Sequence, residues 1–474
     1  MPSLRIRVPT EDLRPGLERI RHDLHVPEAF PPEVEAEATA ALARGPEPLE
    51  RADHRDLPLL TIDPPGSRDL DQAFFAVRRD GGTRIHYAIA DLAAFVRPES
   101  EVDREAWRRG QTLYMPDLRA PLHPAAISEG AASLLPEQDR PALLWTIDVD
   151  EAGEVAASRL ERTLVRSRRA LTYAEAQAAL DGDDRGAMGG NDPLVLLREV
   201  GRLREDLERR RGGVSLNLPT QQVTPAPGGY RFSFEAMLPV EGWNAQVSLL
   251  AGHCAASIMA EGGVGILRTL PPIGEGILGK LRRAAEALEI DWPEGASLGD
   301  VVSMQDGGTP ESAAFLIQAT HALRGAGYGV IEGTPPVHGA LALIYAHVTA
   351  PLRRLVDRYA NEVTVALCAD ASPPGWAVDA LPRLPETMAE SDRRSDAVEA
   401  AVLNLAEAVV LAPQVGGMFE ATVIDRGPDR ATVQLRDPPV VAKLDAAGVR
   451  LGERIRVRLN RADPVERRLD LEVV

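Results

Sequence analysis

The hydrophobic pattern changes twice along the chain, and these changes limit the folds open to it. Between residues 57 and 165, apolar residues alternate or gather in short runs, which predicts strands. From Tyr173 to residue 411 they recur mainly at helical spacing, which predicts helices. Residues 414–474 return to short strand-like runs. We therefore expect an α+β fold followed by a small all-β domain.

The strand-rich region contains a hairpin signal. Asp80-Gly81-Gly82 separates the runs 73–79 and 83–96, and a turn of this type joins antiparallel strands. Three further strands are expected at 57–62, 143–149 and 155–165. The expected helices are 173–180, 192–211, 244–261, 277–288, 311–324, 351–369 and 386–411. The expected strands of the tail are 419–424, 431–435, 440–443, 454–459 and 469–473. Five short strands in this space suit an OB-like barrel.

The pattern of residues 1–50 predicts a short helical N-terminal module. Helical periodicity begins at Thr10, Pro31-Pro32 interrupts it, and Gly45-Pro46 ends it. A helix-turn-helix-like module and a simple arm on the next domain are both compatible with this pattern.

The net charge of −18, from 71 acidic and 53 basic residues, argues by itself against nucleic-acid binding. Net charge is an average, however, and a basic surface can lie within an acidic shell. Residues 414–474 carry eleven basic and ten acidic residues, so the tail is the least acidic part of the chain.

The chain contains two cysteines, Cys254 and Cys368, far apart and outside any CxxC motif. A disulfide framework and a zinc site are therefore not expected. Met1 to Pro15 lacks the apolar run of a secretory signal, and no stretch is long and apolar enough to span a membrane. We expect a cytoplasmic protein without membrane contact.

Three aspartates gather where one expected strand ends and the next begins. Asp63 follows an apolar run, a Pro-Pro-Gly turn comes next, and Asp69 and Asp71 follow two residues apart. In an extended segment this spacing places both carboxylates on one face. Carboxylates this close repel one another unless a cation or raised pKa values relieve them, and their oxygens suit Mg²⁺ or Mn²⁺. A solvated acidic loop or a structural Ca²⁺ loop has equal weight from the spacing alone.

A second polar cluster follows at residues 345–357. Pro351 suits the first position of a helix, which would place Arg353 and Arg354 in the first turn. An anionic ligand would explain arginines there, because that end of a helix already attracts negative charge. The alternative, favoured without the aspartates, is a plain Arg353–Asp357 pair.

Several motifs in one order resemble the ribonuclease II (RNB) family. TIDPPGSRDLDQA is similar to the family signature TIDxxxxxDxDDA, and HVTAPLRRLVD is similar to its arginine motif THxTSPIRRYxD. Between them stand HYAIADLAAFV, TLYMPD, PLHP, ISEGAASLLP and RPALLW, in the family's order. The resemblance covers roughly 55–410. It implies an RNB catalytic domain at 51–412, a mixed sheet with helices forming an RNA channel. It also implies an OB-fold RNA-binding domain of the ribosomal protein S-one type at 413–474.

This resemblance implies a processive 3′→5′ exoribonuclease that uses Mg²⁺, with Mn²⁺ as an alternative, and releases nucleoside 5′-monophosphates. Its expected partner is the single-stranded 3′ end of RNA, and we expect a monomer. Asp63, Asp69 and Asp71 match three of the family's four catalytic aspartates and would hold the metal. Arg353 matches the arginine that stabilises charge on the scissile phosphate, and Arg354 stands beside it as an RNA contact.

Two tyrosines also match the family. Tyr114, in TLYMPD, matches a tyrosine that stacks near the RNA 3′ end, and Tyr173, in LTYAEA, matches another RNA-contacting tyrosine. Core packing is the equally weighted alternative for both when the resemblance is set aside.

The chain departs from the family at three positions. Gln72 stands where the fourth aspartate is expected, and an amide offers only a neutral oxygen and N–H donors. Gln246 replaces a residue that helps to read the ribose 2′-hydroxyl, and Leu355 replaces a tyrosine. We expect Gln72 to assist or orient within an active enzyme. The alternatives are a non-catalytic RNA-binding protein that lost cleavage through Gln72, and a phosphohydrolase of small nucleotides.

The tail offers one aromatic residue, Phe419, for stacking on RNA. Arg454, Arg456 and Arg458 alternate along an expected strand and would form an RNA-facing stripe, with a solvated face as the alternative. Residues 1–50 are too few for the two cold-shock OB domains that the family often carries. We expect substrate guidance to differ, with structured RNA admitted more easily.

Overall fold

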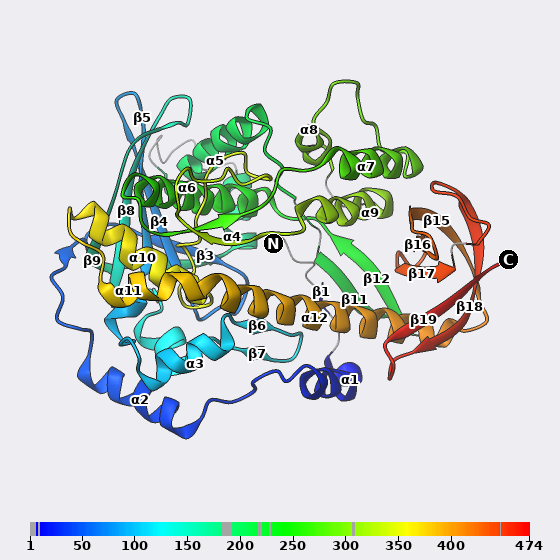
Figure 1. Ribbon diagram of the computed structural model, residues 1–474, viewed down its shortest axis with the longest axis horizontal. Helices are drawn as coiled ribbons and strands as arrows, with labels where there is room; N and C mark the ends of the chain where they lie inside the picture. The colour runs from blue at the N-terminus through cyan, green and yellow to red at the C-terminus, as the bar shows by residue number, and fades with distance from the viewer. Residues whose placement is uncertain are drawn as a thin grey trace.

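The computed structural model describes residues 6–7, 10–182, 192–216, 218, 220–226, 229–305, 309–445 and 447–474. A large part of the molecule, here called the body, contains a seven-stranded sheet, and a small five-stranded barrel lies at the other end (Figure 1). The long helix α12 (Leu384–Leu411) runs between them. The expected order of strands, helices and a final all-β domain is confirmed.

A seven-stranded sheet forms the centre of the body, in the order β10-β3-β4-β5-β8-β9-β2. Its pairs are antiparallel except β10–β3 and β2–β9, which are parallel. The bounds are β2 (Ala52–Asp53), β3 (Leu60–Asp63), β4 (Gln72–Arg79), β5 (Gly82–Ala90), β8 (Asp139–Asp150), β9 (Val155–Arg166) and β10 (Arg169–Thr172). The expected hairpin is confirmed, because β4 and β5 pair directly through a turn at Gly81, whose φ of 79° suits glycine.

The two faces of this sheet carry different cores because side chains alternate along each strand. Tyr87 and Trp145 point into the larger core with the helices α4 (Tyr173–Asp181), α5 (Pro193–Arg210), α6 (Pro239–Glu261) and α10 (Leu355–Cys368). Their neighbours Ala88 and Leu144 point to the opposite core, which α2 (Pro32–Arg44) covers. Burying both faces fixes the strand register, since a slip of one residue would exchange the two sets.

Several elements have no counterpart in the expected pattern. The helix α3 (Glu101–Arg109) is capped by the preceding Ser100, whose hydroxyl accepts from the Asp103 N–H. Short strands form β1 (Ile6–Arg7), β6 (Leu113–Tyr114), β7 (Arg119–Ala120), β11 (Thr220–Ala226), β12 (Gly229–Glu235), β13 (Ile266–Thr269) and β14 (Gly327–Val330). The helices α8 (Leu298–Ser303) and α11 (Gly375–Ala380) were also not expected, whereas α7 (Glu275–Ala287) and α9 (Pro310–Ala319) correspond to the helices expected at 277–288 and 311–324.

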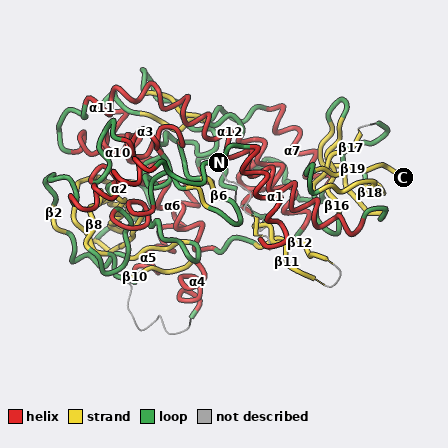
Figure 2. The backbone as a smooth tube through the Cα atoms, turned by 90° about the horizontal axis from the view of Figure 1, so that it is seen from below, coloured by secondary structure: helices red, strands yellow, loops and turns green. Residues whose placement is uncertain are grey.

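Helix α12 contributes to three separate hydrophobic cores. Leu384 and Met388 at its start pack in the sheet core, and Leu411 at its end packs in the barrel. Between them, Val402 and Leu405 pack with α1 (Thr10–Asp23), which lies alongside α12 in both views (Figures 1 and 2). The helical character expected for residues 1–50 is confirmed, and α1 lies against the helix that carries the barrel.

The tail forms a five-stranded antiparallel sheet in the order β17-β16-β15-β18-β19, with β17 and β19 in contact, so the barrel is nearly closed. Its strands are β15 (Met418–Arg426), β16 (Arg430–Leu435), β17 (Val441–Asp445), β18 (Arg454–Asp463) and β19 (Arg468–Val473). The expected OB-like barrel is confirmed. Cys254 and Cys368 are both free thiols. In the described ranges, no helix has the length and apolar character needed to cross a bilayer.

Candidate active site

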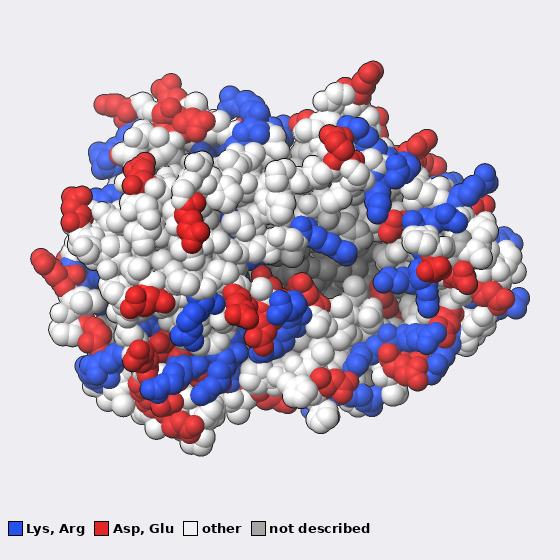
Figure 3. All heavy atoms as spheres, viewed as in Figure 1, with Lys and Arg blue, Asp and Glu red and all other residues white. Residues whose placement is uncertain are grey.

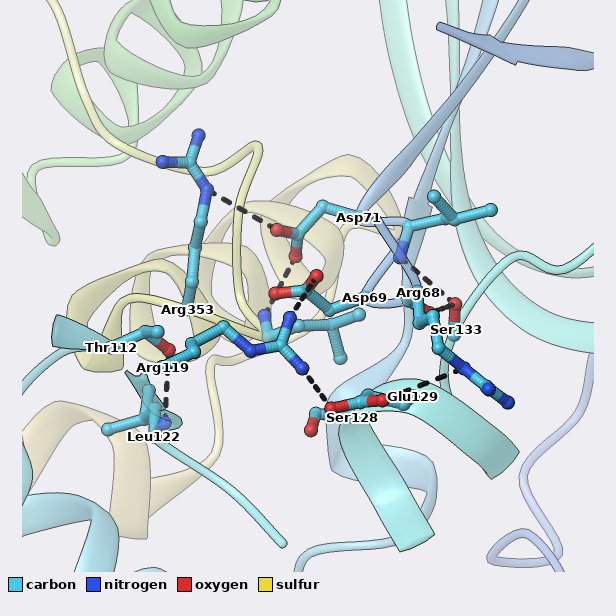
Figure 4. A network of polar contacts seen from close by, with 12 residues as sticks. Arg68, Asp69, Asp71, Thr112, Arg119, Leu122, Ser128, Glu129, Ser133 and Arg353 are labelled. Atoms are coloured by element: carbon cyan, nitrogen blue, oxygen red, sulfur yellow. Dashed lines mark hydrogen bonds and ion pairs between the residues drawn. The ribbon is translucent and has the colours of Figure 1, made fainter. Parts of the chain in front are cut away.

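The three aspartates of the sequence motif lie where β3 ends and β4 begins. Asp63 is the last residue of β3, and Asp71 directly precedes β4. Leu70 is buried between Asp69 and Asp71, and its N–H donates to the Ser133 hydroxyl at 3.0 Å. The segment is therefore extended, with Leu70 in the core and both carboxylates on the other face, as the spacing predicts (Figure 4).

Burial makes two of these carboxylates, those of Asp63 and Asp71, hard to ionise. Burial raises the pKa of Asp71 to about 8, although the Arg353 charge and the Leu352 N–H favour the ionised form. Burial also raises the pKa of Asp63 to about 6, and the negative charge of Asp69 adds to this rise. The Asp63 Oδ2 atom is buried without a hydrogen-bond partner. Together these features describe a place prepared for positive charge.

Arg119 supplies one positive charge beside the aspartates, and the sequence motifs did not point to it. It lies on β7, opposite Tyr114 of β6. Its Nη1 donates to the Asp69 Oδ1 at 2.5 Å, and its Nη2 donates to Glu129 (Figure 4). The Pro-Asp turn after Tyr114 was a signal for this hairpin, which would have placed residue 119 beside the aspartates.

The arginine motif forms a loop that packs against the aspartates. Asp357, fully buried in α10, accepts from the Ala350 N–H at 2.6 Å and from two nitrogens of Arg354 at 2.8 Å each. Arg354 precedes α10, which begins at Leu355. The expected helix start at Pro351 is therefore wrong, because Asp357 holds residues 350–354 in a turn. The alternative Arg353–Asp357 pair is also wrong, since Arg354 is the partner.

Arg353 is left to face the aspartates. Its Nε lies 3.5 Å from the Asp71 Oδ2, and its side chain is 44% exposed. The Leu352 N–H donates to the Asp71 Oδ1 at 2.8 Å. The Gln72 amide donates to the Thr349 carbonyl, so the residue at the fourth aspartate position binds the loop. These contacts join two motifs that lie 281 positions apart in the chain.

Two of the three aspartates already have protein partners. Arg119 binds Asp69, while Leu352 and Arg353 contact Asp71. In the part of the chain that the structure describes, no group of three or more His, Cys, Asp or Glu side chains is placed to hold a metal ion. The role of all three aspartates as metal ligands therefore stays a prediction.

Comparison with known proteins places this arrangement in a family. The family model described as the RNB domain matches residues 51–369, about two thirds of the chain. The chain belongs to the RNB family. A second model, the RNase II-type exonuclease C-terminal S1 domain, matches residues 418–474, which form the barrel.

Curated relatives of this RNB chain include two proteins named Ribonuclease R. The one from Vibrio cholerae is 30% identical over 372 residues, covering 74% of this chain and 44% of the relative. The one from Escherichia coli is 26% identical over 505 residues, covering 95% of this chain and 61% of the relative. The chain thus spans about half the length of these relatives.

Solved structures show the same fold. Mycoplasma genitalium RNase R in complex with ribose methylated single-stranded RNA has a TM-score of 0.82 at 17% identity, covering 98% of this chain and 78% of that chain. Yeast Ssd1, described as a pseudonuclease, has a TM-score of 0.68 at 15% identity, covering 97% and 58%. At these identities the likeness concerns the fold alone.

The two predicted tyrosines lie differently in this RNB fold. Tyr114 is 52% exposed on β6, and the charges of Arg353, Asp69 and Asp71 act on its hydroxyl. An exposed ring beside the aspartates is available for stacking. Tyr173 begins α4 and is partly buried against the sheet core, so packing accounts for at least part of its surface. Their contacts with RNA stay predictions.

Two other predicted RNA contacts are buried. Gln246 lies inside the α5–α6 contact, where its amide donates to the Glu208 Oε2 at 2.7 Å. Phe419 is 8% exposed in the barrel core. A ring in that position packs against aliphatic neighbours and presents no face to a base, so the stacking role proposed for Phe419 is corrected. The placement of Gln246 likewise gives no support to a ribose contact.

The arginine stripe is on the surface, as expected. Arg454, Arg456 and Arg458 are exposed on β18, with buried Val457 on the other face. Arg454 forms an ion pair with Glu289, which extends from the body. Arg456 and Arg458 are therefore the members of the stripe best placed to meet an RNA phosphate.

Proposed function

We propose that this chain is a 3′→5′ exoribonuclease that hydrolyses RNA, mainly single-stranded, with a divalent metal ion and releases nucleoside 5′-monophosphates. The observation that carries the proposal is the joining of Asp71 to Leu352 and Arg353. An arginine with an exposed guanidinium beside buried carboxylates is the arrangement needed to hold a phosphodiester against a metal ion.

The aspartates fit a hard divalent cation whose remaining ligands are water molecules and a substrate phosphate. Mg²⁺ is commonly held by one or two carboxylates together with waters and substrate phosphate, so a three-carboxylate cage is not required. The Asp63 Oδ2 atom is buried without a hydrogen-bond partner, which leaves it available to a cation. Asp63, Asp69 and Asp71 would hold Mg²⁺ or Mn²⁺, which would activate water and polarise the phosphate.

The chain's own residues would do the rest. Arg353 would bind the scissile phosphate and stabilise its growing negative charge. Tyr114, exposed beside the cluster, would stack on a base near the RNA 3′ end. Gln72 would orient the arginine loop through its contact with Thr349. Arg456 and Arg458 would bind phosphates upstream.

The mixed surface charge supports a single-stranded substrate bound along a limited track. On the face in Figure 3, basic and acidic side chains are mixed around a central hollow between the body and the barrel, and this face has no broad basic patch. A strand bound by a few arginines and one stacking ring fits this surface. We further propose that the protein acts as a cytoplasmic monomer.

The proposal is tested with 5′-labelled poly(A) in Mg²⁺, with and without EDTA. Processive shortening to a small end-product, lost in EDTA, is expected. Asp71→Asn should bind the RNA and leave it intact, and retained cleavage would remove Asp71 from the mechanism. Binding without shortening by the natural chain would instead identify a non-catalytic RNA-binding protein that lost cleavage through Gln72. Neither binding nor shortening would leave a phosphohydrolase of small nucleotides.

A further inference from the structure

A cavity of about 520 Å³ lies where helix α7 of the body meets strand β15 of the barrel. A volume of this size is typical of sites for small ligands. Basic side chains gather over α7 beside the central hollow in Figure 3. The lining of this cavity, here called the junction cavity, includes one acidic and four basic residues: Asp425, Lys280, Arg283, Arg324 and Arg426. Its charged residues are therefore mostly positive, in a chain whose net charge is −18.

The four basic side chains of the junction cavity form no ion pair within the ranges that the structure describes. The acidic lining residue, Asp425, accepts from the backbone N–H of the next residue at 2.9 Å. Asp396 of α12 lies within electrostatic range of Arg324. Glu286 and Arg282 of α7 lie outside the lining and carry opposite charges. Counting all of these residues, the cavity has two more positive than negative charges.

A neighbouring cavity of about 370 Å³ provides a comparison, because it is lined by the adjoining stretches of α7 and β15. Three arginines belong to its lining: Arg436, Arg454 and Arg456. Arg436 pairs with Glu420 at 3.1 Å, and Arg454 pairs with Glu289. Two of these three arginines thus have carboxylate partners. Unpaired positive charge at the meeting of body and barrel is therefore concentrated in the junction cavity.

The positive charges of the junction cavity come from both parts of the molecule. Lys280 and Arg283 stand one turn apart on the same side of α7, and Arg426 ends β15 in the barrel. Like charges around one cavity repel one another, and an anion bound between them would relieve this repulsion. The described lining contains aliphatic residues, among them Leu281 and Ile424, and no aromatic ring. A ligand would therefore be held by its negative charge and not by stacking.

We propose that the junction cavity binds phosphates of the RNA backbone upstream of the 3′ end, as a site separate from the arginine stripe of β18. The inference rests on the RNA binding of the proposed function. Phosphate contacts position a strand without reading its sequence. Because its cations belong to α7 and to β15, this site would hold one RNA strand against the body and the barrel together.

The test measures RNA binding without cleavage. Fluorescence anisotropy of labelled poly(A) in EDTA, at several salt concentrations, gives the slope of log affinity against log salt. The variants are Arg283→Gln in the body, Arg426→Gln in the barrel, and the two together. Arg282→Gln is the matched control, because Arg282 is the adjacent residue of α7, lies outside the lining and has its guanidinium 5.6 Å from the Trp292 ring centroid. Thermal unfolding reports whether each variant is folded.

Each single variant should flatten the salt slope by about 0.7, and the double variant by about 1.4, because each removes one contact with a single-strand phosphate. Arg282→Gln should keep the slope of the natural chain. An oligo(A) of a few nucleotides should bind all variants equally, because α7 and β15 lie away from β3 and β4, where the aspartates are (Figure 1).

Unchanged slopes in the folded cavity variants, or an equal loss in Arg282→Gln, would overturn the proposal. A calorimetric titration with AMP tests a free nucleotide as the source of the phosphate. AMP binding that Arg283→Gln abolishes, with the RNA slope unchanged, would assign the cavity to mononucleotides and also overturn it. Cleavage in Mg²⁺ with unchanged slopes would leave the proposed function and defeat this inference, while flattened slopes without cleavage would do the reverse.

Discussion

Glu407 connects the long helix α12 to the barrel, and its burial lowers the stability of the folded chain by an amount that depends on pH. It lies in α12, 4% exposed, and the carboxylate accepts from the Val441 N–H of β17. Burial raises its pKa from 4.5 to about 8, and this hydrogen bond only partly opposes the rise. The folded chain therefore holds the Glu407 proton at pH values where the unfolded chain has released it.

The sign of the effect on stability follows from proton binding. Because the folded state binds the proton more tightly, the free energy of unfolding should fall as pH rises from about 4.5 to about 8 and change little above. The shift multiplied by about 1.4 kcal/mol per pH unit gives an upper value of about 5 kcal/mol. Glu407→Gln removes the ionisation and keeps an oxygen that can accept from Val441, so this pH dependence should disappear.

The assay is urea unfolding of both proteins between pH 5 and pH 9. Glu407→Gln should be more stable than the natural chain by several kcal/mol at pH 9 and by less than about 1 kcal/mol at pH 5. The control is Glu390→Gln on the same helix, where the side chain is exposed, and it should shift stability by at most about 0.5 kcal/mol at either pH. A difference between Glu407→Gln and the natural chain that is the same at both pH values would refute the reasoning.

Three further predictions concern the candidate site and the barrel. Gln72→Glu removes the donor to the buried Thr349 carbonyl, so unfolding in urea should show a loss of about 1–3 kcal/mol, and an unchanged midpoint would deny that this contact holds the loop. Replacing Arg456 and Arg458 by glutamine should flatten the salt dependence of RNA affinity by about 0.7 per lost phosphate contact, measured by fluorescence anisotropy at several salt concentrations. A slope equal to that of the natural chain would take the stripe out of the RNA path. Tyr114→Ala in a cleavage-dead background should weaken RNA binding by about 1–3 kcal/mol, and equal affinity would mean that the ring does not stack.

The sequence predicts the long, periodic elements well, because each buries one face against a core that its pattern already describes. The hairpin at Gly81 and the five barrel strands are cases of this kind. Short elements such as β6 and β11 carry no such pattern, because their pairing is decided by partners distant in sequence. The expected start of α10 at Pro351 is wrong for a local reason, since the buried Asp357 side chain accepts from the Ala350 N–H and holds the preceding turn.

The aspartates and Arg353 could be found from the sequence because they stand in motifs with fixed spacing. Arg119 stands in no such motif, and only the pairing of β6 with β7, for which the Pro-Asp turn is a weak signal, brings it to Asp69. Phe419 shows the opposite error. The sequence offers this aromatic residue as an RNA contact, although a barrel of this size first needs large side chains to fill its interior.

Because α12 packs in three hydrophobic cores, it fixes the distance between the sheet and the barrel. Its 28 residues span about 42 Å, and its two ends are anchored in the sheet core and in the barrel. Because α1 packs against the middle of α12, this helix is held straight and sets the separation between the aspartates and the arginine stripe. In the proposed activity, an RNA shortened from its 3′ end would leave the barrel at a length fixed by this helix. Inserting whole helical turns would move that length in steps, and changes in salt would alter the grip without altering the length.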